Sequence, residues 1–181
     1  MSREYNSFRS LDGMKQLAVE AWEGQMQAVK QGDLELLKHP AAQELLKSKI
    51  PARLAYIWMD GTPRVVPIWF HWNGNEIVMA SPPKAPKLKA LAKNGKVSLT
   101  IDENTFPHKV LMIRGTARLE TVQGIVPEYI ACSERYFDAA TAKAWLGQLR
   151  GMVSSMVRIT ITPEWVGLLD FQTRFPSALS G

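Results

Sequence analysis

The spacing of apolar residues divides the chain into a helical beginning and a longer part with strand-like patterns. Over residues 11–31, apolar side chains recur every three or four positions, which predicts an amphipathic helix. A shorter helix is expected over residues 41–50, between two prolines. We therefore expect residues 1–50 to form an N-terminal helical extension and residues 51–181 to form the body of a single domain.

Short apolar runs between turn residues predict antiparallel strands in the second part of the chain. The expected strands cover residues 53–59, 63–72, 76–80, 96–102, 109–120, 156–161 and 165–169. Asp60-Gly61 and Asn73-Gly74 separate the first three runs, and Asn-Gly and Asp-Gly are the strongest short signals for a hairpin. The first three strands are therefore expected to pair in order, as a meander.

Two helical segments interrupt the expected strands. Residues 85–93 end at Asn94-Gly95, and residues 126–150 are helical by spacing, with a break near Asp138. Short strands with helices outside them indicate a mainly β, α+β fold whose sheet closes on itself, because closure removes exposed edge strands. We expect a six-stranded antiparallel β-barrel with flanking helices and the N-terminal helical extension.

The strand expected over residues 63–72 is mainly apolar on both faces. One face carries Val66, Ile68, Phe70 and Trp72, and the other carries Val65, Pro67, Trp69 and His71. A half-exposed antiparallel strand would alternate between apolar and polar residues. The barrel interior can cover one face, and a partner subunit, the N-terminal helices or a flat apolar ligand can cover the other. Pro67 indicates an edge or a bulge at that point.

The positive charge of the chain is concentrated in one segment. The formal net charge is +5, from 22 basic and 17 acidic residues. No acidic residue lies between Glu76 and Asp102, a window that holds five lysines: Lys84, Lys87, Lys89, Lys93 and Lys96. Without these five, the basic residues would equal the acidic ones in number. The excess therefore favours a local anionic ligand over a nucleic-acid-binding surface.

The beginning of the helix over residues 85–93 is a candidate anion site. Helix N-termini carry partial positive charge, so Lys84 and Lys87 are unfavourable there unless an anion accompanies them. A phosphate would satisfy both lysines, and Arg64, at the start of the central strand, is the natural third member. Alternatively, the lysines form a solvated face and Arg64 flanks a turn.

Other sites and compartments are constrained by what the sequence contains. A single cysteine and three histidines provide neither an internal disulfide nor a zinc cluster, so no metal site is expected. Nucleotide-binding glycine motifs and hydrolase motifs do not occur. Cys132 is expected to be a buried thiol, His71 a buried structural residue and His108 a surface residue.

The longest uncharged stretch, residues 65–75, is far shorter than the roughly 20 apolar residues of a membrane-spanning helix. The charged residues 1–10 cannot hold the apolar core of a secretory signal, so a cytoplasmic location without membrane contact is expected.

Tryptophan is frequent in the predicted barrel and its helices. The tryptophans concerned are Trp58, Trp69, Trp72, Trp145 and Trp165. They are most simply core and interface residues, but an aromatic wall is also what a planar ring system stacks on. The sequence leaves both interpretations open.

Several short segments, in this order and spacing, resemble the pyridoxamine phosphate oxidase-like split-barrel family. The segments are Arg53-Leu54-Ala55-Tyr56, residues 60–70, Met79-Ala80-Ser81, residues 84–91, Lys96-Val97-Ser98-Leu99 and Ile113-Arg114-Gly115-Thr116-Ala117. The similarity covers about residues 41–119, with a weaker echo at residues 163–165. It implies a split β-barrel homodimer that binds FMN, or the related deazaflavin coenzyme, at the subunit interface.

The resemblance also implies which residues contact the cofactor. Arg64 would bind the cofactor phosphate, and the backbone around Val66, Pro67 and Ile68 would run along the flavin ring. Ala80 and Ser81 at a strand end, with Lys87 and less certainly Lys84 on the following helix, would complete the phosphate site. A bound flavin itself performs hydride or electron transfer, so no catalytic side chain is assigned.

Two departures from the family pattern argue against oxidation of pyridoxine phosphate. The family's oxidases carry a C-terminal Arg-x-x-Arg-Leu-His-Asp type motif for substrate, whereas the corresponding segment here reads Phe171-Gln172-Thr173-Arg174-Phe175. A glutamine that contacts the cofactor in those oxidases corresponds to Val110, which cannot make that hydrogen bond. We therefore expect an FMN-dependent oxidoreductase that acts on a different small-molecule substrate.

Three alternatives to an FMN enzyme remain at this stage. The same fold could use the deazaflavin coenzyme for reductase chemistry, because Lys89, Lys93 and Lys96 would suit its acidic tail. A non-catalytic flavin- or haem-binding module is the second alternative, with His71 or His108 as an iron ligand. An interaction protein whose basic helix contacts an acidic partner is the third, and its binding would weaken broadly with salt.

Overall fold

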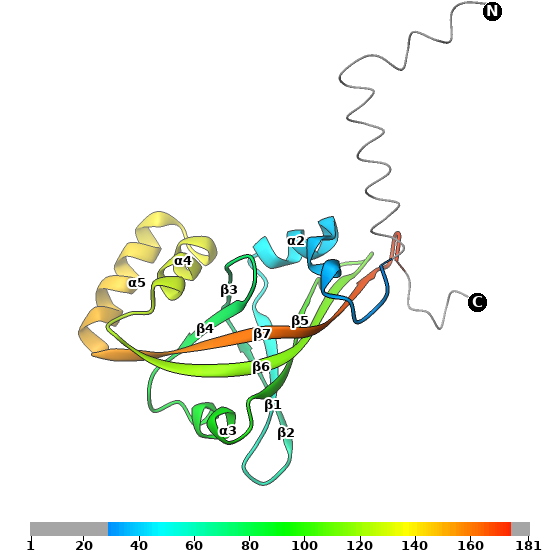
Figure 1. Cartoon of the computed structure of the whole chain (residues 1–181). Coiled ribbons are helices and arrows are strands. Elements are labelled where there is room, and N and C mark those ends of the chain that lie inside the picture. The colour runs from blue at the N-terminus through cyan, green and yellow to red at the C-terminus, as the bar shows by residue number, and fades with distance from the viewer. Residues whose placement is uncertain (1–28, 175–181) are drawn as a thin grey trace, which may run out of the picture.

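One antiparallel sheet of seven strands, with helices around it, makes up the computed structural model, which describes residues 29–174 (Figure 1). The elements in chain order are the 3-10 helix η2 (Leu34–Lys38), α2 (Pro40–Lys47), β1 (Ala52–Ile57), β2 (Pro63–Ile68), β3 (His71–Trp72), β4 (Ile77–Ser81), α3 (Lys87–Lys93), β5 (Lys96–Asp102), β6 (Lys109–Gln123), α4 (Pro127–Tyr136), α5 (Ala139–Met152) and β7 (Ser155–Asp170). The helix expected over residues 11–31 falls almost wholly outside the described residues. None of the described helices is long and apolar enough to span a bilayer.

The sheet curls into a split barrel, but it does not close as expected. Its strand order is β2-β1-β5-β6-β7-β4-β3, so β2 and β3 are the two edges. These edges are consecutive in the chain and are separated only by Trp69 and Phe70. The prediction of a closed, six-stranded barrel is therefore wrong: the sheet has seven strands and is open between its edges. The run over residues 63–72 leaves the hydrogen-bonded ladder at Phe70, whose side chain is fully buried.

The hairpins at Asp60-Gly61 and Asn73-Gly74 are both confirmed, but the run between them is divided into the strands β2 and β3. Trp72 pairs with Ile77 across the second turn, and the Asn73 side chain accepts hydrogen bonds from the backbone N–H groups of Asn75 and Glu76. Strand β4 pairs with β3, the second part of that run, and on its other side with β7. The turn residues therefore predicted the local hairpin, whereas the second neighbour of β4 depends on the strand order of the whole sheet.

A single long strand, β7, replaces the two C-terminal strands expected over residues 156–161 and 165–169. Strand β7 pairs with β6 along nearly its whole length, and the register shifts between Arg114 and Gly115, opposite Pro163. The bulge accommodates a proline that has no N–H to donate, so the strand continues. A side chain on Gly115 would overlap the Thr162 carbonyl, so the close approach of the strands requires glycine there.

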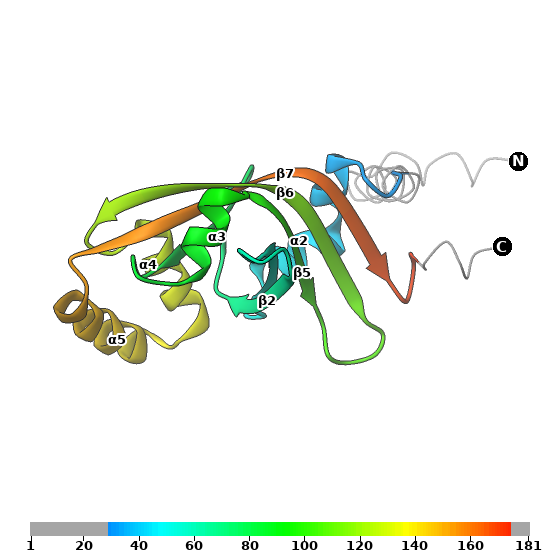
Figure 2. The ribbon, with the colours of Figure 1, turned by 90° about the horizontal axis from the view of Figure 1, so that it is seen from below.

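Helices α4 and α5 form the connection between β6 and β7 and lie at one end of the long β6–β7 hairpin (Figures 1 and 2). The expected break near Asp138 is confirmed, because its carboxylate caps α5 by accepting a hydrogen bond from the Thr141 N–H at 3.0 Å. Helix α4 packs against β3 and β4. The helix pair is therefore positioned over the strands that form one edge of the sheet.

Strand β2 is an edge strand, as Pro67 indicated, and its apolar side chains are only partly covered. Val66 and Ile68 are half-buried against the core, whereas Val65 is 61% exposed. Residues 29–174 thus provide one cover for this strand and leave its other face accessible. The second cover expected from the sequence is not supplied by the part of the chain that the structure describes.

Candidate functional site

An aromatic cleft of about 430 Å³ lies between the strands β2 and β4 and the helices α4 and α5. It is lined by Pro67, Ile68, Trp69, Ala80, Tyr129, Phe137 and Trp145. All seven side chains are uncharged, and four of them are aromatic. The volume is in the range of small-molecule sites, which are mostly apolar and carry few polar groups.

Trp69 is the centre of the aromatic wall. Its ring stacks on that of Tyr136, with a centroid distance of 4.7 Å and an interplanar angle of 7°. Tyr129 lies 5.7 Å from it at a tilt, and Phe137 meets it edge-on at 5.0 Å. Trp145 donates a hydrogen bond from Nε1 to the Tyr129 hydroxyl at 3.1 Å. These contacts hold Trp69 against α4 and fix the shape of the cleft.

Arg135 connects α4 to the bend between β2 and β3. Its guanidinium donates to the carbonyls of Leu46, at 3.2 Å, and Phe70, and it lies over the Phe70 ring at 4.6 Å. It also lies 5.0 Å from the centroid of the Tyr136 ring. The Phe70 carbonyl, which leaves the ladder at the bend, thus receives a charged donor. Arg135 thereby stabilises the backbone on which Trp69 sits.

The cleft brings together three of the residues that the sequence assigned to the cofactor. Pro67, Ile68 and Ala80 all line it. Val66 does not; its side chain packs against the core. Ser81, the next residue after Ala80, is buried at the end of β4 and pairs with Val157. The segment of β2 that was expected along the flavin ring and Ala80 of β4, which was expected at the phosphate, therefore face a common space, although the two strands are far apart in the sheet order.

The basic residues assigned to a phosphate lie outside this cleft. The Arg64 guanidinium lies over the Trp58 ring, 4.6 Å from its centroid, and Lys84 is exposed in the loop before α3. Helix α3 packs against β6 and β1 (Figures 1 and 2), and β1 pairs with β2, the strand that carries Arg64. The structure thus places Arg64, Lys84 and Lys87 on neighbouring elements, without a direct contact between their side chains.

Lys87 differs from the other lysines of this segment because it is half-buried. Among residues 29–174 it has no hydrogen-bond or ion-pair partner, and burial lowers the pKa of its ammonium group. Lys96, in contrast, is exposed and pairs with Glu164 at 2.9 Å. A bound anion would compensate the cost of burying the Lys87 charge. The electrostatics therefore identify Lys87 as the lysine best suited to an anionic group.

The other residues considered from the sequence lie away from the cleft. His71 is half-buried in β3, and His108 has its Nδ1 3.1 Å from the Glu103 carbonyl oxygen. Cys132 is buried, as expected, and burial raises the pKa of its thiol to about 11. Within the described part of the chain, histidine, cysteine and acidic side chains form no group of three that could hold a metal ion.

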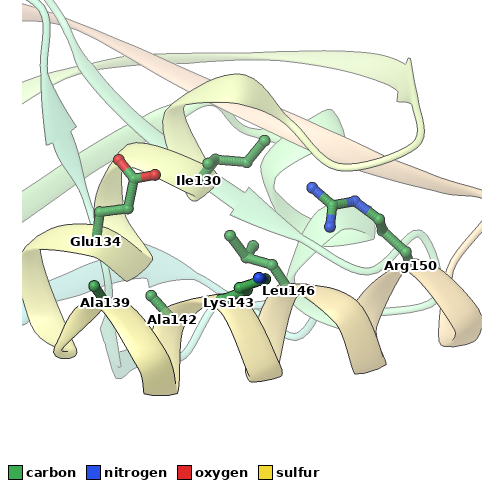
Figure 3. A pocket seen from close by; sticks show the side chains of 7 residues that line it. All are labelled: Ile130, Glu134, Ala139, Ala142, Lys143, Leu146 and Arg150. Carbon is green, nitrogen blue, oxygen red and sulfur yellow. The ribbon is translucent and has the colours of Figure 1, made fainter.

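A second cavity, of about 460 Å³, lies in the groove between α4 and α5 (Figure 3). It is lined by Ile130, Glu134, Ala139, Ala142, Lys143, Leu146 and Arg150. Figure 3 shows its charged side chains around an apolar floor that includes Leu146. None of the residues expected to bind a cofactor lines this groove, so the aromatic cleft is the candidate functional site.

Sequence reasoning found only part of the aromatic wall. Two of the five tryptophans singled out, Trp69 and Trp145, line the cleft. Trp58 and Trp165 instead lie under the guanidinium groups of Arg64 and Arg114. Tyr129 and Phe137 were missed, and no local pattern distinguishes them from other half-buried aromatic residues of a helix.

Comparisons with known proteins agree with this fold. Residues 39–170 match the family model described as pyridoxamine 5'-phosphate oxidase. An F420 reductase structure is 22% identical, with a TM-score of 0.54, and the match covers 69% of this chain and 94% of that one. A conserved hypothetical protein from Mycobacterium tuberculosis is 20% identical, with a TM-score of 0.56 and coverage of 72% and 82%. General stress protein 26 from Bacillus anthracis is 14% identical, with a TM-score of 0.54 and coverage of 75% and 94%. A search of curated proteins finds no significant match.

Proposed function

Because the chain belongs to the pyridoxamine 5'-phosphate oxidase family, we propose that it is an oxidoreductase that uses FMN. The observation that carries the proposal is the aromatic cleft, where Pro67, Ile68 and Ala80 meet a wall of aromatic side chains. A flavin bound there would supply hydride or electron transfer, while the protein supplies binding and orientation.

The residues present suit the two ends of this cofactor. The cleft is uncharged and large enough for a planar ring system, and the backbone of Val66, Pro67 and Ile68 would run along that ring. The phosphate would be bound by Lys87, with Lys84 and Arg64 from neighbouring elements. The main support for this placement is Lys87, whose half-buried charge has no partner among the described residues. Ser81, at the end of β4, would border the phosphate.

The substrate is proposed to differ from pyridoxine phosphate. The C-terminal segment that would bind that substrate in the family's oxidases is replaced by residues 171–175, and Val110 occupies the position of a cofactor-binding glutamine. These departures and the cofactor assignment together favour an FMN oxidoreductase of another specificity.

A titration with FMN, monitored by flavin absorbance and fluorescence, tests the proposal. The double variant Lys84→Ala/Lys87→Ala should weaken FMN binding by roughly tenfold or more, because two charges near the phosphate are removed. Lys143→Ala is the matched control, since Lys143 is an exposed lysine of the α4–α5 groove. Failure of the unaltered protein to bind FMN, or equal losses in the control and the double variant, would refute the proposed site.

A deazaflavin coenzyme is the second candidate cofactor. An F420 reductase is among the similar structures, and Lys89 and Lys93 are exposed on α3 with no acidic partner among residues 29–174. These lysines would suit an acidic tail. Parallel titrations with FMN and with the deazaflavin coenzyme distinguish the two candidates. Tighter binding of the deazaflavin, lost when Lys89 and Lys93 are replaced by Ala, would assign the protein to that branch.

A homodimer is proposed as the functional unit. Its support is the accessible apolar face of the β1–β2 hairpin, where Ile57, Met59 and Val65 are exposed large hydrophobic residues. Burial of such a patch against a second copy removes it from water. Sedimentation analysis of the unaltered protein and of Val65→Lys tests this: the variant should dissociate, and a monomeric unaltered protein would contradict the proposal.

A further inference from the structure

We infer that the aromatic cleft selects flat, uncharged conjugated rings as the substrate. It rejects molecules whose part inside the cleft carries an anionic group. The inference rests on the proposed function, because it concerns the molecule that meets the cofactor in this cleft. It is carried by the lining of the cleft, in which none of the seven side chains is charged.

Two arginines flank the lining residues, and the guanidinium groups of both bond to other parts of the protein. Arg135 precedes Tyr136 in α4, and its guanidinium is held by the carbonyls of Leu46 and Phe70. Arg158 pairs with Ala80 between β4 and β7, and its guanidinium is bound by two carboxylates. These belong to Glu120, at 2.8 Å, and Glu128, at 3.1 Å. Among residues 29–174, no cationic side chain lines the cleft itself, so an anionic substrate group would have no direct positive partner there.

Both phenols beside the aromatic wall take part in hydrogen bonds within the protein. The Tyr129 hydroxyl accepts the hydrogen bond from Trp145, and the Tyr136 hydroxyl donates to the Ile50 carbonyl at 3.1 Å. Burial raises the pKa of both phenols, so they remain neutral. A ligand therefore meets ring faces and edges, which favour aromatic stacking. An ionised group placed there would lose water without meeting a cationic side chain of the lining, which is unfavourable.

Charge is thus segregated between the two parts of the proposed site. The unpaired lysines lie on and before α3, outside the cleft, where they suit the phosphate of the cofactor. The cleft itself has seven uncharged lining residues. A substrate with its own phosphate would need a second anion site, and residues 29–174 provide none in this cleft. A neutral ring needs only the aromatic wall.

The test is a pair of ligands of equal shape and different charge: 2-naphthamide, which is neutral, and 2-naphthoate, which is an anion. Isothermal titration calorimetry of the FMN-loaded protein should show roughly tenfold or greater preference for the amide, because the carboxylate must be desolvated without compensation. Equal or tighter binding of the carboxylate, or no binding of the amide, would overturn the inference.

Two variants show whether the preference arises in this cleft. Phe137→Arg adds a cation to the wall and should shift the preference towards naphthoate by about tenfold, since a charged hydrogen bond becomes available. Ile130→Arg adds the same charge to the groove of Figure 3, on another side of α4, and should leave the preference unchanged. Equal shifts in both variants would place the binding elsewhere and refute the assignment.

The same experiment separates this inference from the proposed function. If FMN does not bind, the proposed function fails, and titration of the protein without FMN still measures the preference of the cleft. A preference for the amide in that titration supports the inference about the cleft, and a preference for the carboxylate overturns it. If FMN binds and the carboxylate is preferred, only the inference fails.

Discussion

Replacement of Arg135 by Met measures how strongly the bend between β2 and β3 depends on α4. The substitution keeps an unbranched apolar stem and removes the guanidinium, so the carbonyls of Leu46 and Phe70 lose a charged donor. Each partly buried acceptor left without a partner costs about 1–3 kcal/mol. Loss of the contact over the Phe70 ring adds about 1 kcal/mol.

Part of this loss is offset, because the buried Nε of Arg135 has no hydrogen-bond partner in the folded protein. The net expectation is a decrease of about 3 kcal/mol in the free energy of unfolding, from the sum of these contributions. For a chain of 181 residues this corresponds to a fall of about 6–12 °C in Tm. Thermal and urea denaturation followed by circular dichroism would measure both quantities.

Arg118→Met is the matched control for this experiment. Arg118 is exposed and pairs with Glu76 at 3.0 Å, and exposed ion pairs contribute about 0–1 kcal/mol. A loss below about 1 kcal/mol for Arg135→Met, equal to that of the control, would show that water replaces the guanidinium at both carbonyls. The bend would then be stable without α4, contrary to the reasoning above.

The remaining predictions concern two glycines and the single cysteine. Gly95→Ala should destabilise the fold by about 1–3 kcal/mol in urea denaturation, because the new Cβ would lie 2.7 Å from the Ala117 carbonyl oxygen. Gly147→Ala, in α5 with open space around the new Cβ, should instead stabilise it by up to about 1 kcal/mol; a loss would contradict this. Cys132 has a folded pKa of about 11 against a reference of 9.0, so its contribution to stability is present below pH 9 and is lost as pH rises through 11. The free energy of unfolding, measured by urea denaturation between pH 8 and 11, should therefore fall more steeply with pH for the unaltered protein than for Cys132→Ala. Parallel curves for the two proteins would contradict the raised pKa of Cys132.

Local signals in the sequence predicted local structure well. The hairpin at Asn73-Gly74, the break at Asp138 and the edge position of Pro67 are all set by residues within a few positions of one another. On its other side, β4 pairs with β7, which is far away in the chain, and no local signal predicts that neighbour. Likewise, two strands were expected over residues 156–161 and 165–169, whereas a bulge at Gly115 of β6, opposite Pro163, lets one strand continue.

The residues of the candidate site that belong to recognisable sequence segments were predicted. Those that reach the site only through the packing of a distant helix were missed. Pro67, Ile68 and Ala80 were found because they belong to segments that resemble the family. Tyr129 and Phe137 were not found, since their role depends on which strands α4 covers. Trp69 lies in the bend between the two edge strands, β2 and β3, and this bend brings it to Tyr129 and Phe137. A single sequence has no signal that shows which two strands will be the edges of a sheet.

The helical wall of the cleft is a self-contained insertion in a hairpin. Gln123 still pairs with Ser155, and the Gly124 N–H donates to the Ser154 carbonyl at 2.8 Å, so the chain leaves and re-enters the sheet at almost one point. Since the cost of closing a loop grows only slowly with its length, the segment between these residues can lengthen or shorten at little cost in loop closure, provided that Arg135 and the buried Val126 and Leu149 keep their contacts. The barrel and the proposed phosphate site can therefore stay constant while this one segment changes the ligand that is recognised. The substrate range of the proposed enzyme would then depend on this insertion rather than on the barrel.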